Sequence, residues 1–297
     1  MPTEKRKERT MLRIMTHNVW NRDDNLPAWE EKGNNCSAAV RVKGHMRVYE
    51  ETQPDIIGGQ EFSRLMAELM KGEFEAAGKN YALIWGRFTP ILYRPEKLEL
   101  LNTEFLTYPE ALPGYEGEFN DVKSKACNIA VFRVKESGNV FVFATTHLWW
   151  KAEPGDPSYA NVKGNELLGS DKAREYQIAL AIERIEKYRA AYGNCPAVFV
   201  GDMNTGYNTE AIKYAVENGY RHARFIATDF ADTAAGYHNC FGWGYEPFYL
   251  DYPFETAIDH ILLKGEKEGS VKRFERYSPE YYLPISDHSP AFIDFDI

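Results

Sequence analysis

Short apolar runs that stop abruptly at polar residues recur along the chain, and the clearest lies between Pro196 and Gly201. This run predicts a core strand, and Asp202 and Asn204 follow it directly. Side chains at i and i+2 of an extended chain project to the same side, so we expect Asp202 and Asn204 together at the strand's end. The alternative is an Asx-type turn that closes the strand, because Asp and Asn hydrogen-bond their own backbone.

The same pattern predicts the other elements of the chain. Short apolar or alternating runs predict strands at 11–19, 55–61, 82–85, 90–93, 98–101, 128–134, 140–146, 256–263 and 291–295. Helical spacing predicts helices at 38–52, 62–77, 170–193 and 210–218, with Ser170 as the N-cap of the third. Long connections remain at 102–127, 149–169 and 237–252. Connections of this length are often functional, so we expect substrate specificity to reside in them.

Composition narrows the class of protein. The chain has 297 residues, of which 44% are hydrophobic and 14% aromatic, enough for a large core. Since no linker or internal repeat is found, we predict one domain at 11–297 after a disordered or weakly ordered tail at 1–10. The formal net charge of -9 disfavours duplex nucleic acid, whose binding usually needs a basic face.

The cysteines and the apolar segments bear on the compartment. The four cysteines lie far apart without a Cys-x-x-Cys pair, which predicts free thiols in a reducing compartment. No run approaches the roughly 20 apolar residues that span a bilayer, and no segment typical of a signal peptide follows the charged N-terminus. We therefore expect a cytoplasmic monomer without a transmembrane segment.

Polar residues gather at the ends of the predicted strands or in the turns beside them: Asn18, Glu61, His147, Asp202 with Asn204, Asp259, and Asp287 with His288. Each has a structural alternative. Glu61 could begin the next helix, where the dipole favours an acidic residue, and His147 could be a satisfied structural histidine. The residue types nevertheless fit one task, because oxygen ligands suit magnesium and two histidines with a carboxylate suit proton transfer near neutral pH.

Seven short motifs carry a resemblance to a known family. They are Thr-His-Asn-Val at 16–19, Gly-Gln-Glu at 59–61, Ile-Leu-Tyr-Arg at 91–94, Thr-His-Leu at 146–148, Gly-Asp-Met-Asn at 201–204, Ile-Asp-His-Ile at 258–261 and Ser-Asp-His-Ser-Pro at 286–290. In this order and spacing the chain resembles the endonuclease/exonuclease/phosphatase superfamily, with the deoxyribonuclease I-like fold. The resemblance implies an α+β fold, a four-layer α/β/β/α sandwich of two mainly antiparallel sheets with helices outside and an active site at one rim.

The resemblance also implies a metal and a base. Glu61 would be the principal ligand of Mg²⁺, which Mn²⁺ could replace, and Asn18 and Asp287 would support it directly or through water. Asp202 would orient and deprotonate the attacking water. Asn204 would fix the position of Asp202 and contact the phosphate.

The resemblance implies roles for two histidines as well. His288, held by Asp259, would bind a phosphoryl oxygen and take part in proton transfer, and His147 would do so from the opposite side. His17 and His260 adjoin proposed site residues, but neighbours in a strand face opposite ways, so we expect them to be structural.

One stretch departs from the family pattern. Nuclease members commonly carry a Tyr and a Glu in the strand before Ile-Leu-Tyr-Arg, where this chain has Trp85-Gly86-Arg87. We therefore expect His147 to lack the carboxylate that would support a general acid. Arg87 is expected to meet a substrate anion instead.

These observations lead to a functional hypothesis with two alternatives. We expect a Mg²⁺-dependent phosphoester hydrolase of a small phosphorylated substrate, such as a sugar phosphate, nucleotide or phospholipid head group. Arg87, Trp149 and Trp243 are the candidate substrate contacts, and single-stranded nucleic acid is a second candidate partner. The first alternative is a metal-dependent nuclease acting on DNA or RNA, and the second is a catalytically silent member that binds a phospho-ligand or a protein.

Overall fold

Two β-sheets pack face to face in the computed structural model, which describes residues 10–120, 122–156, 164–231 and 254–297. In the described residues the first sheet has seven strands, in the order β10 (Asp229–Ala231), β12 (Val271–Arg276), β13 (Ala291–Asp296), β1 (Met11–Asn18), β2 (Ile56–Gln60), β4 (Ile91–Tyr93) and β3 (Ala82–Ile84). The second has six, in the order β5 (Leu98–Thr107), β6 (Ala126–Val134), β7 (Val140–His147), β8 (Ala197–Asp202), β11 (Asp259–Lys264) and β9 (Arg221–His222).

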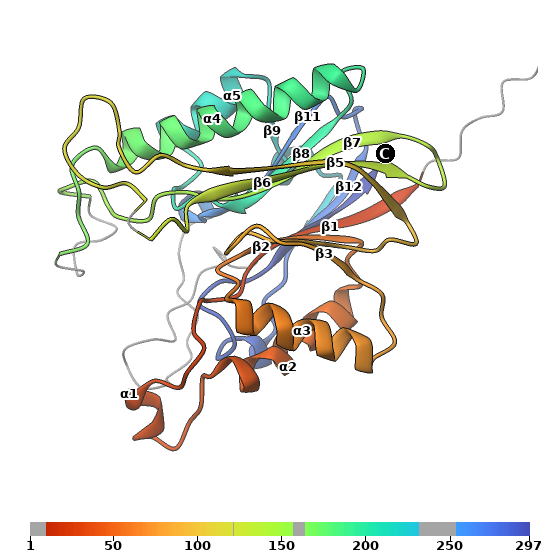
Figure 1. Cartoon of the computed structure of the whole chain (residues 1–297). Helices are drawn as coiled ribbons and strands as arrows, with labels where there is room; N and C mark the ends of the chain where they lie inside the picture. Colours follow the sequence, from red (N-terminus) through yellow and green to blue (C-terminus); the bar gives the residue numbers. More distant parts are fainter. Residues whose placement is uncertain (1–9, 121, 157–163, 232–253) are drawn as a thin grey trace, which may run out of the picture.

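Helices cover the outer face of each sheet (Figure 1). In the described residues the α-helices are α1 (Pro27–Glu30), α2 (Ala38–Thr52), α3 (Arg64–Ala76), α4 (Ser170–Ala191), α5 (Glu210–Glu217) and α6 (Ala223–Ile226), and the 3-10 turns are η2 (Phe254–Thr256) and η3 (Glu280–Tyr282). Apolar side chains of α2 and α3 pack on the first sheet, and those of α4 and α5 pack on the second. The expected four-layer α+β sandwich is confirmed.

The strand directions bring separate polar strand ends to one rim. Strands β1 and β2 are parallel, and so are β7 and β8, so the carboxyl ends of each pair lie side by side. In the second pair His147 lies opposite Asp202 in the register. Strand β11 runs antiparallel to β8, so its first residue, Asp259, also pairs with Asp202.

The two sheets approach each other closely just below this rim. A Cβ atom added to Gly58 in β2 would lie 2.5 Å from Val200 Cγ2 and 2.8 Å from Thr145 Cβ in the facing sheet. The adjacent buried Gln60 donates a hydrogen bond from Nε2 to Thr145 Oγ1 at 2.8 Å, and its Oε1 accepts one from Thr16 at 3.3 Å. Two features therefore set the spacing of the sheets at the rim: Gly58, which has no side chain, and the hydrogen bond between Gln60 and Thr145.

Most predicted elements occur within a few residues of their expected bounds, with informative exceptions. The edge strand β5 continues to Thr107, inside the stretch expected to be a long connection, because its polar residues face solvent on an exposed edge. The N-cap of α4 is Gly169 rather than Ser170, whose hydroxyl donates to Leu167 O at 2.6 Å. Strand β12 was not predicted, since its sequence Val-Lys-Arg-Phe-Glu-Arg is mostly charged.

Parts of three expectations fall outside the described residues. These are residues 1–9 of the expected tail, residue 121 and residues 157–163 of the two earlier connections, and all of the connection 237–252. None of the helices in the described part of the chain is both long enough and apolar enough to span a bilayer.

We predict that Gly58→Ala lowers the free energy of unfolding by about 1–3 kcal/mol, because the new methyl group forces Val200 and Thr145 to move in a packed interior. Urea unfolding followed by circular dichroism measures the change. Gly72→Ala is the control, because Gly72 lies exposed in α3 with nothing within 4 Å of an added Cβ. It should be neutral or stabilising by up to about 1 kcal/mol. Equal effects of the two changes would contradict the proposed spacing role.

Candidate active site

Two carboxylates from different sheets meet at one amide. Asn18, at the end of β1, donates from Nδ2 to Asp202 Oδ2 at 2.9 Å and to Glu61 Oε1 at 3.2 Å. Glu61 follows β2 in a left-handed conformation (φ 59°), and its Oε2 accepts from the backbone N–H of Asn21 at 2.8 Å. Helix α3 begins only at Arg64, so Glu61 does not begin that helix. The site thus holds two acidic groups close together at the rim.

The orientation of Asn18 changes its expected role. Its Oδ1 accepts from the backbone N–H of Trp20 at 3.0 Å, while its Nδ2 faces the two carboxylates. In this arrangement Asn18 orients Glu61 and Asp202 and does not present an oxygen for a metal ion.

Asp202 uses its two oxygens differently. Oδ1 accepts from the backbone N–H of Asn204 at 3.0 Å, which is the Asx-type turn, while Oδ2 faces Asn18 and the two site histidines. Asn204 leaves the extended conformation (φ 50°), and its Nδ2 donates to Leu148 O at 3.0 Å. The turn therefore orients Asp202 toward the site, and the hydrogen bond from Asn204 to Leu148 O stabilises the end of β8.

His288 is held as expected. Its Nδ1 lies 2.7 Å from Asp259 Oδ2, and its Nε2 lies 3.7 Å from Asp202 Oδ2. Burial opposes a charge on the ring, but Asp259, Asp287 and Asp202 outweigh that effect and raise the pKa of His288 well above its ordinary value. A carboxylate on Nδ1 fixes the ring orientation and leaves Nε2 directed at the site.

Two aspartates of the site, Asp202 and Asp287, resist ionisation. Burial, against the opposing charge of His288, raises the pKa of Asp202 to about 6. Burial, with added repulsion from Glu61 and Asp202, raises the pKa of the partly exposed Asp287 to about 7. Two aspartates with raised pKa values beside Glu61 fit a bound cation, which would favour their charged forms.

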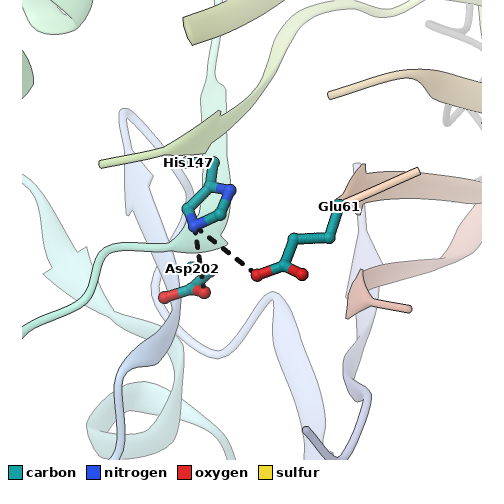
Figure 2. A group of neighbouring side chains, drawn as sticks. All are labelled: Glu61, His147 and Asp202. Carbon is teal, nitrogen blue, oxygen red and sulfur yellow. Dashed lines mark ion pairs between the residues drawn. The ribbon is translucent and has the colours of Figure 1, made fainter. Parts of the chain in front are cut away.

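His147 faces the same carboxylates from the second sheet (Figure 2). Its Nε2 lies 3.4 Å from Asp202 Oδ2 and 4.0 Å from Glu61 Oε1. The buried Lys125 places Nζ 2.7 Å from the same nitrogen. Burial, followed by the charges of Lys125 and His288, lowers the pKa of His147 well below its ordinary value. Lys125 was missed in the sequence because it stands in a polar connection without a recognisable motif.

The ligand atoms indicate which metal fits. One ligand atom each of Glu61, His147 and Asp202 lie within 4.8 Å of one another, and the same holds for Asp202, Asp259 and His288. Nε2 of His147 already contacts Lys125, and Nδ1 of His288 contacts Asp259. The charged ring of His288 also carries a proton on Nε2, so that nitrogen cannot bind a metal. The ligand atoms that remain are carboxylate oxygens, which suit a hard divalent cation such as Mg²⁺.

A buried arginine holds the loops that carry the site. The guanidinium of Arg41, in α2, donates to the carbonyl oxygens of Val19, Trp20, Arg22, Cys36 and Ile285 at 2.6–3.0 Å. The first three carbonyls follow Asn18, and the last precedes Asp287 by two residues. This role is not visible in the sequence, because a single arginine in a helix normally faces solvent.

Ser286 links the same two segments. Its hydroxyl donates to the carbonyl oxygen of Asn18 at 2.9 Å and accepts from the backbone N–H of His288 at 3.2 Å. The end of β1 and the turn before β13 are therefore held together by Arg41 and Ser286.

The expected substrate contacts have different outcomes. Arg87 is exposed in a left-handed conformation (φ 52°), and the next residue, Phe88, accepts from the N–H of Phe62 at 3.2 Å, beside Glu61. Trp149 is fully buried and donates its indole N–H to Ser170 at 3.1 Å, so its expected contact with substrate is wrong. Trp243 lies outside the described residues.

The two neighbouring histidines lie where structural residues would. His17 is buried, with Nδ1 2.9 Å from the Tyr49 hydroxyl and Nε2 against the Tyr282 hydroxyl. His260 is also buried, and its Nε2 contacts Thr205 O at 2.7 Å.

The chain is similar to known proteins in sequence and in fold. The sequence model of the Endonuclease/Exonuclease/phosphatase family matches residues 15–288. A search of curated protein sequences gave no significant match. Similar solved structures include a protein of this family from Bacteroides thetaiotaomicron, with 20% identity, 98% of this chain and 100% of that chain covered, and a TM-score of 0.70.

Two further structures have names that state an activity or a ligand. A mannosyl-6-phosphatase from B. thetaiotaomicron has 20% identity and a TM-score of 0.69, with 96% of this chain and 100% of that chain covered. TDP2 from D. rerio in complex with a single-strand DNA product has 15% identity and a TM-score of 0.64, with 97% and 100% covered. At these identities the likeness concerns the fold.

We predict that Arg41→Met lowers the free energy of unfolding by about 3 kcal/mol or more, because each buried carbonyl left without a donor costs about 1–3 kcal/mol. Urea unfolding measures the change. Arg47→Met on the same helix is the control, since its side chain is 56% exposed and pairs with Glu51 on the surface. That control should change stability by less than about 1 kcal/mol. A loss at Arg41 no larger than at Arg47 would contradict the role given to Arg41.

Proposed function

Because the chain belongs to the endonuclease/exonuclease/phosphatase family, we propose that it is a Mg²⁺-dependent hydrolase of a small phosphorylated substrate. One observation carries the proposal. Glu61 and Asp202 come from different sheets, share the amide of Asn18, and lie beside a charged His288 held by Asp259. This arrangement supplies the acidic and cationic groups that hydrolysis of a phosphoester requires at one point.

Asp202 is the proposed base. Its Oδ2 faces the site, while Oδ1 is used by the turn, so one oxygen remains to orient an attacking water and accept its proton. A carboxylate whose pKa lies closer to neutral is a better base at neutral pH than an ordinary aspartate. Asn204 keeps the strand end in place, and its contact with the phosphate stays a proposal from the family resemblance.

His288 is the proposed positively charged group that contacts the phosphoryl group of the substrate. Asp259 holds Nδ1, and Nε2 lies on the side of Asp202, where it would donate to a phosphoryl oxygen as negative charge builds there. The hydrogen bond to Asp259 also keeps the ring in one orientation, so that little reorganisation is needed during the reaction.

Glu61 and Asp287 are the residues that would hold Mg²⁺, with Asn18 orienting Glu61. The fit rests on oxygen donors and on the raised pKa of Asp287, which a cation would reverse. When bound, the ion would neutralise charge on the phosphoryl oxygens. Mn²⁺ has similar ligand preferences and should substitute for it.

The substrate class is supported by charge and by fold relatives. A net charge of -9 disfavours a long polyanion and is compatible with a small one. The mannosyl-6-phosphatase of similar fold supports a sugar phosphate among small substrates. TDP2, crystallised with a single-strand DNA product, supports keeping oligonucleotides in the test.

We predict hydrolysis of at least one sugar phosphate, nucleotide or phospholipid head group with Mg²⁺, and loss of that activity with EDTA. A panel that also contains single-stranded and plasmid DNA measures it through released phosphate and gel analysis. Cleavage of DNA alone would favour the nuclease alternative. Binding of a phospho-ligand without turnover of any substrate would favour the silent binding protein.

We further predict that Asp202→Asn lowers kcat/KM about 10²- to 10⁴-fold and His288→Ala about 10²- to 10³-fold, the ranges for a lost base and a lost donor. Glu68→Gln is the control, because this carboxylate is 64% exposed on α3. Thermal unfolding checks that each variant is folded. Wild-type rates in both site variants would refute the assigned roles.

A further inference from the structure

The contact between Lys125 and His147 differs from the histidine and carboxylate pair implied by the family resemblance. Nζ of Lys125 lies 2.7 Å from Nε2 of His147, and the two residues are only 4% and 3% exposed. An ammonium group only donates, so Nε2 must accept, and the proton of a neutral ring lies on Nδ1. No acceptor among the described residues reaches that Nδ1, so no such contact stabilises a positive ring.

We propose that Lys125 is a catalytic residue whose ammonium group binds a phosphoryl oxygen of the substrate, in the place that a charged His147 would otherwise take. The proposal rests on the proposed function, because it assigns Lys125 to the same phosphoryl site. His147 then acts as a neutral acceptor that aims the ammonium group. No proton is transferred in this role, since the contribution is a charged hydrogen bond to a non-bridging oxygen.

The position of Lys125 fits this role. The imidazole nitrogen that it contacts is the atom facing Asp202 at 3.4 Å and Glu61 at 4.0 Å. Its charge is close enough to oppose the raised pKa of Asp202, as that of His288 does. Asp202 therefore has two cations nearby, His288 from the turn before β13 and Lys125 from the connection before β6.

A buried amide fixes the backbone of Lys125. Asn120, fully buried, donates from Nδ2 to the carbonyl oxygens of Lys125 and Tyr108 at 2.9 and 2.8 Å, and its Oδ1 accepts from the N–H of Lys125 at 2.9 Å. The Tyr108 hydroxyl lies 2.7 Å from that of Thr146, the neighbour of His147. The connection before β6 is thus anchored to β7 at the point where its lysine meets the histidine.

The chemistry of a phosphoryl group suits this ammonium group. A phosphoryl group carries negative charge on several oxygens, each of which accepts a short, charge-assisted hydrogen bond from an ammonium donor. The substrate class proposed above therefore supplies the kind of ligand that Lys125 would bind.

The test measures binding of inorganic phosphate by calorimetry with Mg²⁺ present, and kcat/KM on the best substrate of the panel. Lys125→Met should weaken phosphate binding about 10- to 100-fold, the value of one charge-assisted hydrogen bond, and lower kcat/KM about 10²- to 10³-fold. Lys125→Arg should retain part of both. His147→Gln keeps an acceptor for the ammonium and should lose less than Lys125→Met.

Lys123→Met is the matched control, because this lysine lies two residues away in the same connection, is 59% exposed and pairs with Glu110. It should behave as wild type. Thermal unfolding checks each variant, and Lys125→Gln replaces Lys125→Met if the latter does not fold. Unchanged phosphate affinity in the Lys125 variants, or a larger loss from His147→Gln than from Lys125→Met, would overturn the proposal.

Phosphate binding also separates this proposal from the proposed function. A wild-type protein that hydrolyses nothing in the panel but loses phosphate affinity in Lys125→Met would refute the enzyme and retain the Lys125 site. Turnover that depends on Asp202 but not on Lys125 would do the reverse.

Discussion

The close packing of the two sheets at one rim is the constraint on which the site depends. Glu61 belongs to one sheet and Asp202 to the other, yet a single amide bonds both. This is geometrically feasible only because β2 presents Gly58 to the facing strands, where any larger residue would meet Val200 and Thr145. A core side chain at that position would separate the acids and remove the common point at which water and phosphate could meet.

Charge balance is the second requirement of a site built in this way. Burial is the main cause of the raised pKa values of Asp202 and Asp287, and the neighbouring carboxylates add to it. The chain opposes it with His288 and Lys125, which act from different elements. The positively charged side chains and a metal ion would together balance the negative charge of the acidic residues. The anionic substrate would then balance the positive charge of the cations.

The structure also shows that a structural interpretation and a functional one can both apply to the same residue. Asp202 closes a turn with one oxygen and faces the site with the other. Asn18 was expected to support the metal directly or through water, and its amide nitrogen orients the two carboxylates that face it. Backbone anchors such as Arg41 then keep these orientations fixed, because loops without regular hydrogen bonding need other donors for their carbonyl groups.

Local patterns in the sequence were enough to predict most elements and most residues of the candidate site. Apolar runs that end in polar residues marked β8 and the end of β2, because these signals are local and need no knowledge of contacts. The order of the motifs indicated the four-layer fold through the family that they resemble. Which side chains meet depended on the fold in three dimensions. Lys125 beside His147 and the burial of Trp149 depend on how a polar connection folds back across β7, and no periodicity encodes that path.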